Sequence, residues 1–446
     1  MTVNKSKLIV LTILCLSWLP ATGIVQAASY LAPIIIVSLM ILMRQALIKK
    51  IVIALVFFLL LTLVSLVFNF EEISPSNYLI ATITHLSIIL FAFKINKAKR
   101  LDAYLTSCIA SISIVQLLIG TVQLVMSTGG TLQFSYAGSG DFVTGTLLDN
   151  SHLYVVKMLV ASLYLACVIF RGDRRLHVLT GLIASLLGAI LGSALLTMSI
   201  FFASTLIFFI FAPSFYFRGY SLYKVARAKL AVIAGFFLCL MVFSIIQEQN
   251  VKLIASYANT AIESLSGERN YGLNKIIAAR NIFSEQFSQP EKTLFGYGFG
   301  HYSSRAALIA SDEYLRHQPQ FIPVYTSPTM QAYLIPYWNR STWSIQFQDG
   351  VMNQPFFSVQ SLIVETGLIG FMFVAIIFIL SIRHIAKTIK NGEGEVAYAL
   401  LAIVCVSPLL LLTDNWIEYP SLMLQVAAVV IVFNAHNKSS LKEEYI

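Results

Sequence analysis

Two arginines between residues 248 and 355 have the clearest potential for chemistry in this sequence. Arg269 and Arg280 are eleven residues apart, about three helical turns, so one helix face can carry both side chains. A planar guanidinium holds two phosphate oxygens through parallel hydrogen bonds. The pair therefore suits a lipid-linked diphosphate. The structural alternative is solvated charge, or contact with anionic lipid headgroups.

Histidine and carboxylate side chains are the groups that most often remove a proton in catalysis. His301 directly follows a glycine-rich segment, and His152 lies at the start of an apolar run, at a comparable membrane edge. These two rank first as catalytic candidates, followed by Glu365. His317 is a further candidate, and the sequence does not choose among the four.

Two ionisable residues lie well inside apolar runs. Lys157 and Glu365 are each about two helical turns from one end of such a run. A charge at the centre of a bilayer costs about 2.5–3.5 kcal/mol, so these side chains should face the protein interior. We expect them to line an outward cavity and to pair. The alternative is a buried pair that only fixes helix register.

The composition decides which elements must position these residues. Apolar types make up 57% of the 446 residues, charged types make up 11%, and the mean hydropathy is +0.78. A soluble domain carries roughly 25% charged residues, so this chain cannot cover a soluble surface. That excludes a cytoplasmic enzyme, a secreted disulfide scaffold and a disordered chain, and no nucleic-acid partner is expected. The five cysteines lie in apolar runs without a CxxC pair, so neither a disulfide framework nor a metal cluster is indicated.

Apolar runs of roughly the length needed to cross a membrane, about 17 residues or more, recur along the chain. Twelve are predicted: 8–26, 28–43, 50–68, 77–94, 104–127, 151–170, 176–191, 195–213, 229–247, 356–381, 396–413 and 417–434. Lys and Arg gather at the N-terminus and in every second connection, while the short connections between these hold none. The positive-inside rule therefore places both termini in the cytoplasm. The predicted fold class is an all-α integral membrane protein with about twelve transmembrane helices.

The first run also fits a cleavable signal peptide. Lys5 and Lys7 precede an apolar segment that ends in small residues near Ala27. We expect the segment to be retained, because eleven further spans leave little need for a separate signal. Cleavage would leave Ala28 outside and change no later orientation.

A long translocated segment separates the ninth and tenth predicted spans. It divides the chain into spans one to nine (1–247), an extracytoplasmic loop domain (248–355), and spans ten to twelve with a short cytoplasmic tail (356–446). Residues 267–286 show helix-like spacing of apolar side chains. Tyr and Trp side chains in 297–343 can stack on sugar rings or anchor the membrane interface.

Two stretches resemble the O-antigen ligase and polymerase superfamily, the Wzy and WaaL type of bacterial surface-polysaccharide enzymes. The first is GER at 267–269, a helical segment, and the turn LFGYGFG at 294–300, which either cradles phosphate or makes a tight turn. The second is QPFF at 354–357 followed by LIVETGLIG at 362–370. A weaker match is GTL at 145–147 with DNSH at 149–152.

The sequence departs from the family at two polar positions. The histidine that the family uses as the proposed base falls on Gln354 or Phe356, and a mid-chain arginine falls near Ser199 and Ile200. Neither replacement can do the same chemistry. Because polysaccharide polymerases vary more in sequence than ligases, the resemblance favours a polymerase.

The resemblance implies a metal-independent membrane glycosyltransferase without cofactors, in the bacterial inner membrane, with its active site on the outer face. It would polymerise O-antigen, capsule or exopolysaccharide repeat units carried on undecaprenyl diphosphate. The expected substrate-binding residues are Arg269, Arg280, Lys275, Lys157 and Tyr297. Expected partners are the lipid-linked oligosaccharide, membrane lipids and a chain-length regulator protein. The alternatives are a ligase acting on lipid A core or protein, and a transporter or flippase that uses Lys157 and Glu365 for ion coupling.

Overall fold

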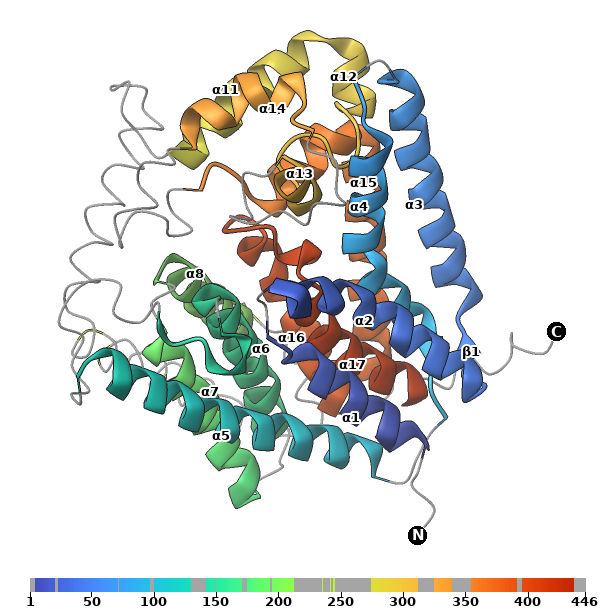
Figure 1. Cartoon of the computed structure of the whole chain (residues 1–446). Coiled ribbons are helices and arrows are strands. Elements are labelled where there is room, and N and C mark those ends of the chain that lie inside the picture. The colour runs from blue at the N-terminus through green and yellow to red at the C-terminus, as the bar shows by residue number, and fades with distance from the viewer. Residues whose placement is uncertain are drawn as a thin grey trace.

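The three-dimensional structure is a computed structural model of the whole chain (Figure 1). It describes residues 5–20, 23–70, 72–96, 100–129, 142–148, 150–170, 175–192, 195–211, 274–311, 325–338, 354–390 and 395–436, with the single positions 235, 241 and 244. Helices predominate among these residues. Two short strands, β1 (Ala46–Leu47) and β2 (Phe93–Lys94), pair antiparallel.

The described helices fall into a large apolar group and a small outer group. The apolar group comprises α1 (Lys5–Ser17), α2 (Gly23–Leu42), α3 (Lys49–Phe68), α4 (Pro75–Thr84), η1 (Leu86–Ala92), α5 (Leu101–Ser127), η3 (Gly145–Leu147), α6 (Ser151–Phe170), α7 (Leu176–Leu191), α8 (Leu195–Phe211), α15 (Ser358–Lys390), α16 (Glu395–Leu410), η7 (Trp416–Glu418) and α17 (Pro420–His436). The outer group, called here the outer module, comprises α11 (Asn274–Ser288), α12 (Pro290–Phe295), α13 (Arg305–Ala310), α14 (Pro328–Tyr333) and η5 (Ile335–Tyr337).

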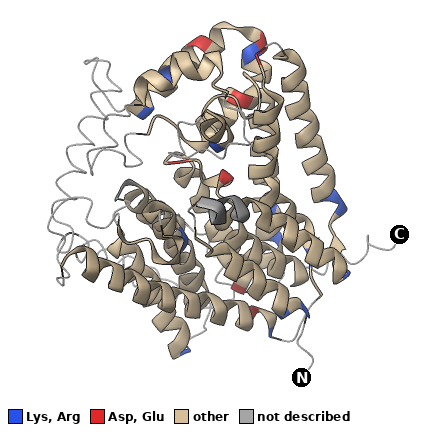
Figure 2. Ribbon diagram, viewed as in Figure 1, with Lys and Arg blue, Asp and Glu red and all other residues tan. Residues whose placement is uncertain are grey.

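Several of these helices are suited to a membrane. Within the described residues, α3, α5, α6 and α15 are each long and apolar enough to cross one, and the bent pair of α4 and η1 would give a fifth. Shorter apolar helices lie at α2, α7, α8, α16 and α17. Figure 2 shows few charged residues along the helices and most of them near helix ends. The structure therefore agrees with the expected all-α membrane class.

The predicted runs match the observed helices unevenly. The separation of 176–191 from 195–213 is confirmed, because α7 and α8 are distinct helices. The boundary between the first two runs is wrong: α1 ends at Ser17, shortly before Pro20, and α2 begins at Gly23. A helix usually ends before a proline, because the residue preceding the ring is pushed out of the helical region. The ninth run, 229–247, lies almost wholly outside the described residues.

The fourth predicted run is bent rather than straight. Helix α4 and the 3-10 helix η1 meet at an angle of 42°. The carbonyl oxygen of Ala81 accepts a hydrogen bond from the Thr84 hydroxyl (2.8 Å) and lies 2.8 Å from Nδ1 of His85. Side chains that bond a helix carbonyl compete with its regular backbone bonds and bend the helix.

Helix α6 is the centre of the apolar group, whereas α3 lies at its edge. In the most apolar 18-residue stretch of each helix, 83% of the stretch is buried in α6, whereas 11% is buried in α3. Helices α5 and α7 pack closely, since a Cβ atom on Gly181 would lie 2.5 Å from that of Ala110. Small residues allow such close approach between membrane helices. Helix α1 also belongs to this core, because Ile9 and Ile13 are fully buried and the helix packs against α17.

The outer module sits at one end of the apolar group, against α15, α3 and α4 (Figure 1). It has its own buried cluster, which includes Ile282, Tyr302, Met330 and Trp338. The predicted helix at 267–286 is present from Asn274, the first residue described there, and continues to Ser288. The module therefore provides a packed support for the glycine-rich turn.

Candidate functional site

The two stretches that carry the family resemblance lie against each other. The backbone N–H of Tyr297 donates to the carbonyl of Val364 (2.8 Å), and that of Gly298 donates to the carbonyl of Glu365 (3.1 Å). The side-chain amide of Gln286 donates to the preceding carbonyl, that of Ile363 (3.0 Å). Three successive carbonyls of α15 are thus bonded by the outer module.

These carbonyls are free to bond the module because α15 is interrupted. Gly367 has φ 68° and ψ −177°, a conformation that glycine alone adopts readily. Gly296, with φ 74°, faces the break, and a Cβ atom on it would lie 2.5 Å from the carbonyl carbon of Glu365. A Cβ atom on Gly367 would in turn overlap the backbone of Leu294. The glycines therefore allow two backbones to touch, which favours the tight-turn interpretation over a phosphate cradle.

The Glu365 carboxylate anchors the loop that follows the turn. It is 1% exposed. Its Oε1 accepts the backbone N–H groups of Tyr302 (3.0 Å), Ser303 (3.1 Å) and Ser304 (2.9 Å), and its Oε2 accepts that of Gly300 (2.7 Å). Both oxygens accept backbone N–H groups and the residue is buried, so the carboxylate is not open to a substrate in this arrangement. In this arrangement Glu365 holds the loop at 300–304.

His301 is also bonded at both ring nitrogens. The N–H of Ser74 donates to Nε2 (2.8 Å), so the neutral ring carries its proton on Nδ1, which donates to the carbonyl of Phe299 (2.9 Å). Burial lowers the pKa of His301 to about 4, so the ring is neutral at pH 7. His301 therefore ties the start of α4 to the turn. It can act as a base only by giving up its bond to Ser74.

A second buried carboxylate lies beside this loop and was missed by the sequence analysis. Oε2 of Glu418 accepts the backbone N–H of Arg305 (2.5 Å) at the start of α13. The Arg305 guanidinium lies 4.1 Å from the ring centroid of Tyr419 and its Nε donates to the hydroxyl of Tyr30. Arg305 and Glu418 are each 3% exposed. The available signal was Glu418 itself, a carboxylate within the predicted run 417–434.

Lys275 points inward from α11, not toward solvent. Its amine donates to the carbonyl of Thr413 (2.5 Å) in the connection between α16 and α17. Burial lowers the pKa of Lys275 to about 8, against the opposing effect of Asp414. Lys275 thus joins the outer module to the apolar group. Arg280, also on α11, is exposed.

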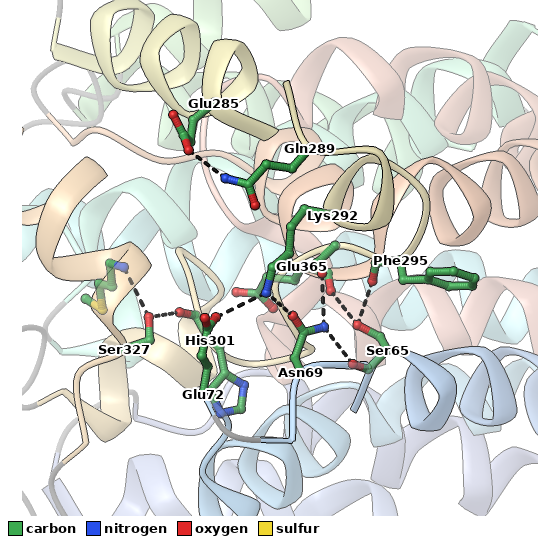
Figure 3. A network of polar contacts seen from close by, with 12 residues as sticks. Ser65, Asn69, Glu72, Glu285, Gln289, Lys292, Phe295, His301, Ser327 and Glu365 are labelled. Carbon is green, nitrogen blue, oxygen red and sulfur yellow. Dashed lines mark hydrogen bonds and ion pairs between the residues drawn. The ribbon is translucent and has the colours of Figure 1, made fainter. Parts of the chain in front are cut away.

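A polar network joins α12 to the end of α3 (Figure 3). Nζ of Lys292 donates to Oδ1 of Asn69 (2.5 Å) and forms an ion pair with Oε2 of Glu72 (3.1 Å). The Asn69 amide donates to the carbonyl of Gly296 (3.1 Å), and the Ser65 hydroxyl donates to that of Phe295 (2.6 Å). Helix α3 and the residue that follows it therefore support the glycine turn through Ser65 and Asn69.

The ring of Tyr297 lies beside Lys292, whose Nζ is 5.1 Å from the ring centroid. The residue is 6% exposed. Its hydroxyl is buried and has no hydrogen-bond partner among the described residues. The structure thus places Tyr297, His301 and Glu365, three of the predicted site residues, around one turn.

Lys157 and Glu365 do not form the expected pair, and that prediction is wrong. Lys157 is fully buried, its amine donates to the carbonyl of Ser17 at the end of α1, and Nζ lies 3.9 Å from the Trp18 ring centroid. A carbonyl and an aromatic face stabilise this amine, while Glu365 is bonded to backbone amides. Each therefore has its own partners. His152, on the first turn of the same helix, has a buried Nδ1 atom with no partner among the described residues.

Three positions singled out in the sequence remain: two of them are not described by the structure, and one is a buried core residue. Arg269 and His317 lie outside the described residues. Phe356, at a position of the family histidine, is 1% exposed and packs edge-on against Trp338, with ring centroids 5.3 Å apart. Phe356 is thus an apolar core residue.

No protein-family model matches this chain, and no curated protein matches it in sequence. The resemblance to the ligase and polymerase superfamily therefore rests on the motifs themselves.

Proposed function

We propose that this chain is a membrane glycosyltransferase that polymerises a bacterial surface polysaccharide. The bond between a growing glycan and undecaprenyl diphosphate would break, and a glycosidic bond would form to the hydroxyl of an acceptor repeat unit. The hydroxyl proton would pass to a base, and undecaprenyl diphosphate would leave. The observation that supports this proposal is the contact of 294–300 with 363–365, since these are the two segments that resemble the family.

The topology that goes with this function has twelve spans, cytoplasmic termini and an outer module on the extracytoplasmic face of the inner membrane. A single cysteine introduced at position 281 of a cysteine-free protein should then react with an impermeant maleimide in intact cells. A cysteine at position 387 should react only after permeabilisation. Labelling of position 387 in intact cells would refute this topology.

The diphosphate would be held by arginines of the outer module. Arg280 is exposed on α11, where a lipid headgroup can approach it, and Arg269 is the second arginine proposed for this role. A fixed guanidinium stabilises charge that develops on the leaving diphosphate. We assign Glu365 and His301 to holding the turn, because their polar atoms are bonded to backbone. His152 and His317 are left as candidate bases, since Nδ1 of His152 has no partner among the described residues and His317 lies outside them.

Deletion of the gene tests the function against its two rivals. A polymerase mutant would leave single capped repeat units on the cell surface. A ligase mutant would leave long chains that are not attached, and a flippase mutant would accumulate carrier-linked units on the inner face. Single repeat units that return to full-length polymer on complementation support the polymerase, and either other phenotype contradicts it.

A further inference from the structure

We infer that the outer module carries a sugar subsite centred on the hydroxyl of Tyr297, selective for neutral or amino sugars over acidic ones. The inference deepens the proposed function, because it names the class of sugar that the polymerase would hold. It depends on side chains from α11, α12 and α14 that converge on one buried hydroxyl.

The first observation is a polar atom without a partner. Tyr297 is 94% buried, since it is 6% exposed, and its hydroxyl has no hydrogen-bond partner among the described residues. A polar group that is buried without a hydrogen bond destabilises the fold, so native proteins rarely keep one without a reason. A ligand hydroxyl that bonds Tyr297 would remove this cost.

The second observation is the set of groups around that hydroxyl. Burial, followed by the nearby Glu285, raises the pKa of Tyr297, so the hydroxyl stays a proton donor at neutral pH. Burial, followed by the charge of Glu285, also raises the pKa of Tyr333, so Tyr333 lies near the same carboxylate. Gln289 donates to Oε1 of Glu285 (2.6 Å), which holds the carboxylate in place. Carboxylate, amide and aromatic groups are those that bind sugar hydroxyls and stack on sugar rings.

The third observation is that these groups reach the surface. Tyr333, Glu285 and Gln289 are partly exposed, and the Glu72 side chain is 48% exposed. Figure 3 shows the pair of Glu285 and Gln289 on one side of Lys292, with Glu72 on the other. A soluble ligand can therefore contact Glu285, Gln289 and Tyr333 from the solvent side.

The charges decide which sugars fit. The ammonium of Lys292 is already bonded to Asn69 and Glu72. Glu72 and Glu285 carry two negative charges against the one positive charge of Lys292, so the subsite is net negative. Like charges in a partly buried site repel. A uronic acid or phosphate is therefore disfavoured, while a neutral sugar or a protonated amino sugar is accepted.

The test measures sugar binding on the purified full chain in detergent, without turnover. The probes are three soluble trisaccharides: one neutral, one with a free amino sugar and one with a uronic acid. We expect the first two to bind and the third to bind at least tenfold more weakly. Tyr297→Phe, which removes only the hydroxyl, should weaken binding at least tenfold and leave the melting temperature unchanged or raised. Glu285→Gln should reduce the discrimination against the uronic acid.

The matched control is Tyr164→Phe, which removes a buried hydroxyl 3.2 Å from that of Thr106 between α6 and α5. It should lower the melting temperature without changing sugar binding. Unchanged sugar affinity in Tyr297→Phe, tighter binding of the uronic acid than of the neutral sugar, or no binding of any probe to the wild type at millimolar concentration would each overturn the subsite. Because binding is read without chain growth, a failure of the polymerase proposal would show separately, in the deletion phenotype.

Discussion

Gly296 and Gly367 touch through their backbones: a Cβ atom on Gly296 would lie 2.6 Å from the backbone nitrogen of Gly367. One residue belongs to the turn of the outer module and the other interrupts α15. Both have positive φ angles, 74° and 68°. The turn can therefore dock only where the helix is broken, and the break is bonded only while the turn is docked.

Replacing either glycine should destabilise the protein. Gly296→Ala and Gly367→Ala each introduce a clash and a backbone conformation that costs about 1–3 kcal/mol for a residue with a side chain. The measurement is thermal unfolding of the purified protein in detergent. Gly129→Asn is the control, since Gly129 also has a positive φ (65°) but no neighbouring atom within 4 Å. A melting temperature that drops as much in the control as in the two variants would argue against docking.

Lys157 and Glu365 should contribute to stability independently. Their partners differ, so the effects of Lys157→Met and Glu365→Gln on the free energy of unfolding should add to within about 0.5 kcal/mol. Glu365→Gln alone should destabilise by about 1–3 kcal/mol, because the new amide N–H would face the N–H groups of the loop. If the double variant is more stable than the sum of the two single effects predicts, the two side chains interact, and the ion-pair interpretation would be correct after all.

His301 should make stability fall at mildly acidic pH. Its pKa is about 4 in the fold and near the ordinary value of 6.5 when unfolded. Between these values the unfolded chain binds more protons, so the free energy of unfolding decreases as the pH drops. Above 6.5 the contribution is fully present. The slope reaches at most about 1.4 kcal/mol per pH unit.

The matched variant for this effect is His301→Gln, whose side-chain oxygen can still accept the Ser74 N–H. It should unfold with a shallower dependence on pH between 4 and 6.5 than the wild type. Equal slopes for the two proteins would show that His301 does not titrate in this range on unfolding.

Arg269 should be needed for activity through its fork of donors. Removing one donor that stabilises developing charge costs about 10²–10³ in rate, so Arg269→Ala should lose almost all activity. Lysine keeps the charge but not the parallel hydrogen bonds, so Arg269→Lys should keep part of it. Glycan chain length on a gel is the readout, with membrane protein level checked beside it. Arg340→Ala serves as the control and should leave chain length unchanged. Full-length polymer from Arg269→Ala would show that Arg269 does not bind the diphosphate.

Local patterns in the sequence predicted local features of the fold. Hydropathy located α3 and α6 closely, and two glycines in one uncharged stretch separated α7 from α8. The family resemblance picked out the segments 294–300 and 362–370, and the structure places them in contact. These features depend on residues that are neighbours in the sequence, so a short stretch of sequence is enough to predict each of them.

The remaining features depend on residues far apart in the chain. Nothing near Lys157 indicates that its amine bonds the carbonyl of Ser17, and hydropathy alone paired it with the wrong partner. The break at Gly367 lies inside an apolar run, so the sequence gives no sign of it. It is stabilised by the outer module, whose backbone N–H groups bond the carbonyls that the break leaves free. Arg305 and Glu418 meet only after α13 docks beside η7.

The most direct test of the central claim is chain growth by the purified protein in lipid vesicles. The substrate is the undecaprenyl-diphosphate-linked repeat unit, with no lipid A core and no other protein present. The proposed function predicts a ladder of glycans of increasing length, with one undecaprenyl diphosphate released for each new glycosidic bond. Substrate that stays a single repeat unit while wild-type protein remains folded, and that is transferred only when lipid A core is added, would contradict polymerisation and establish a ligase.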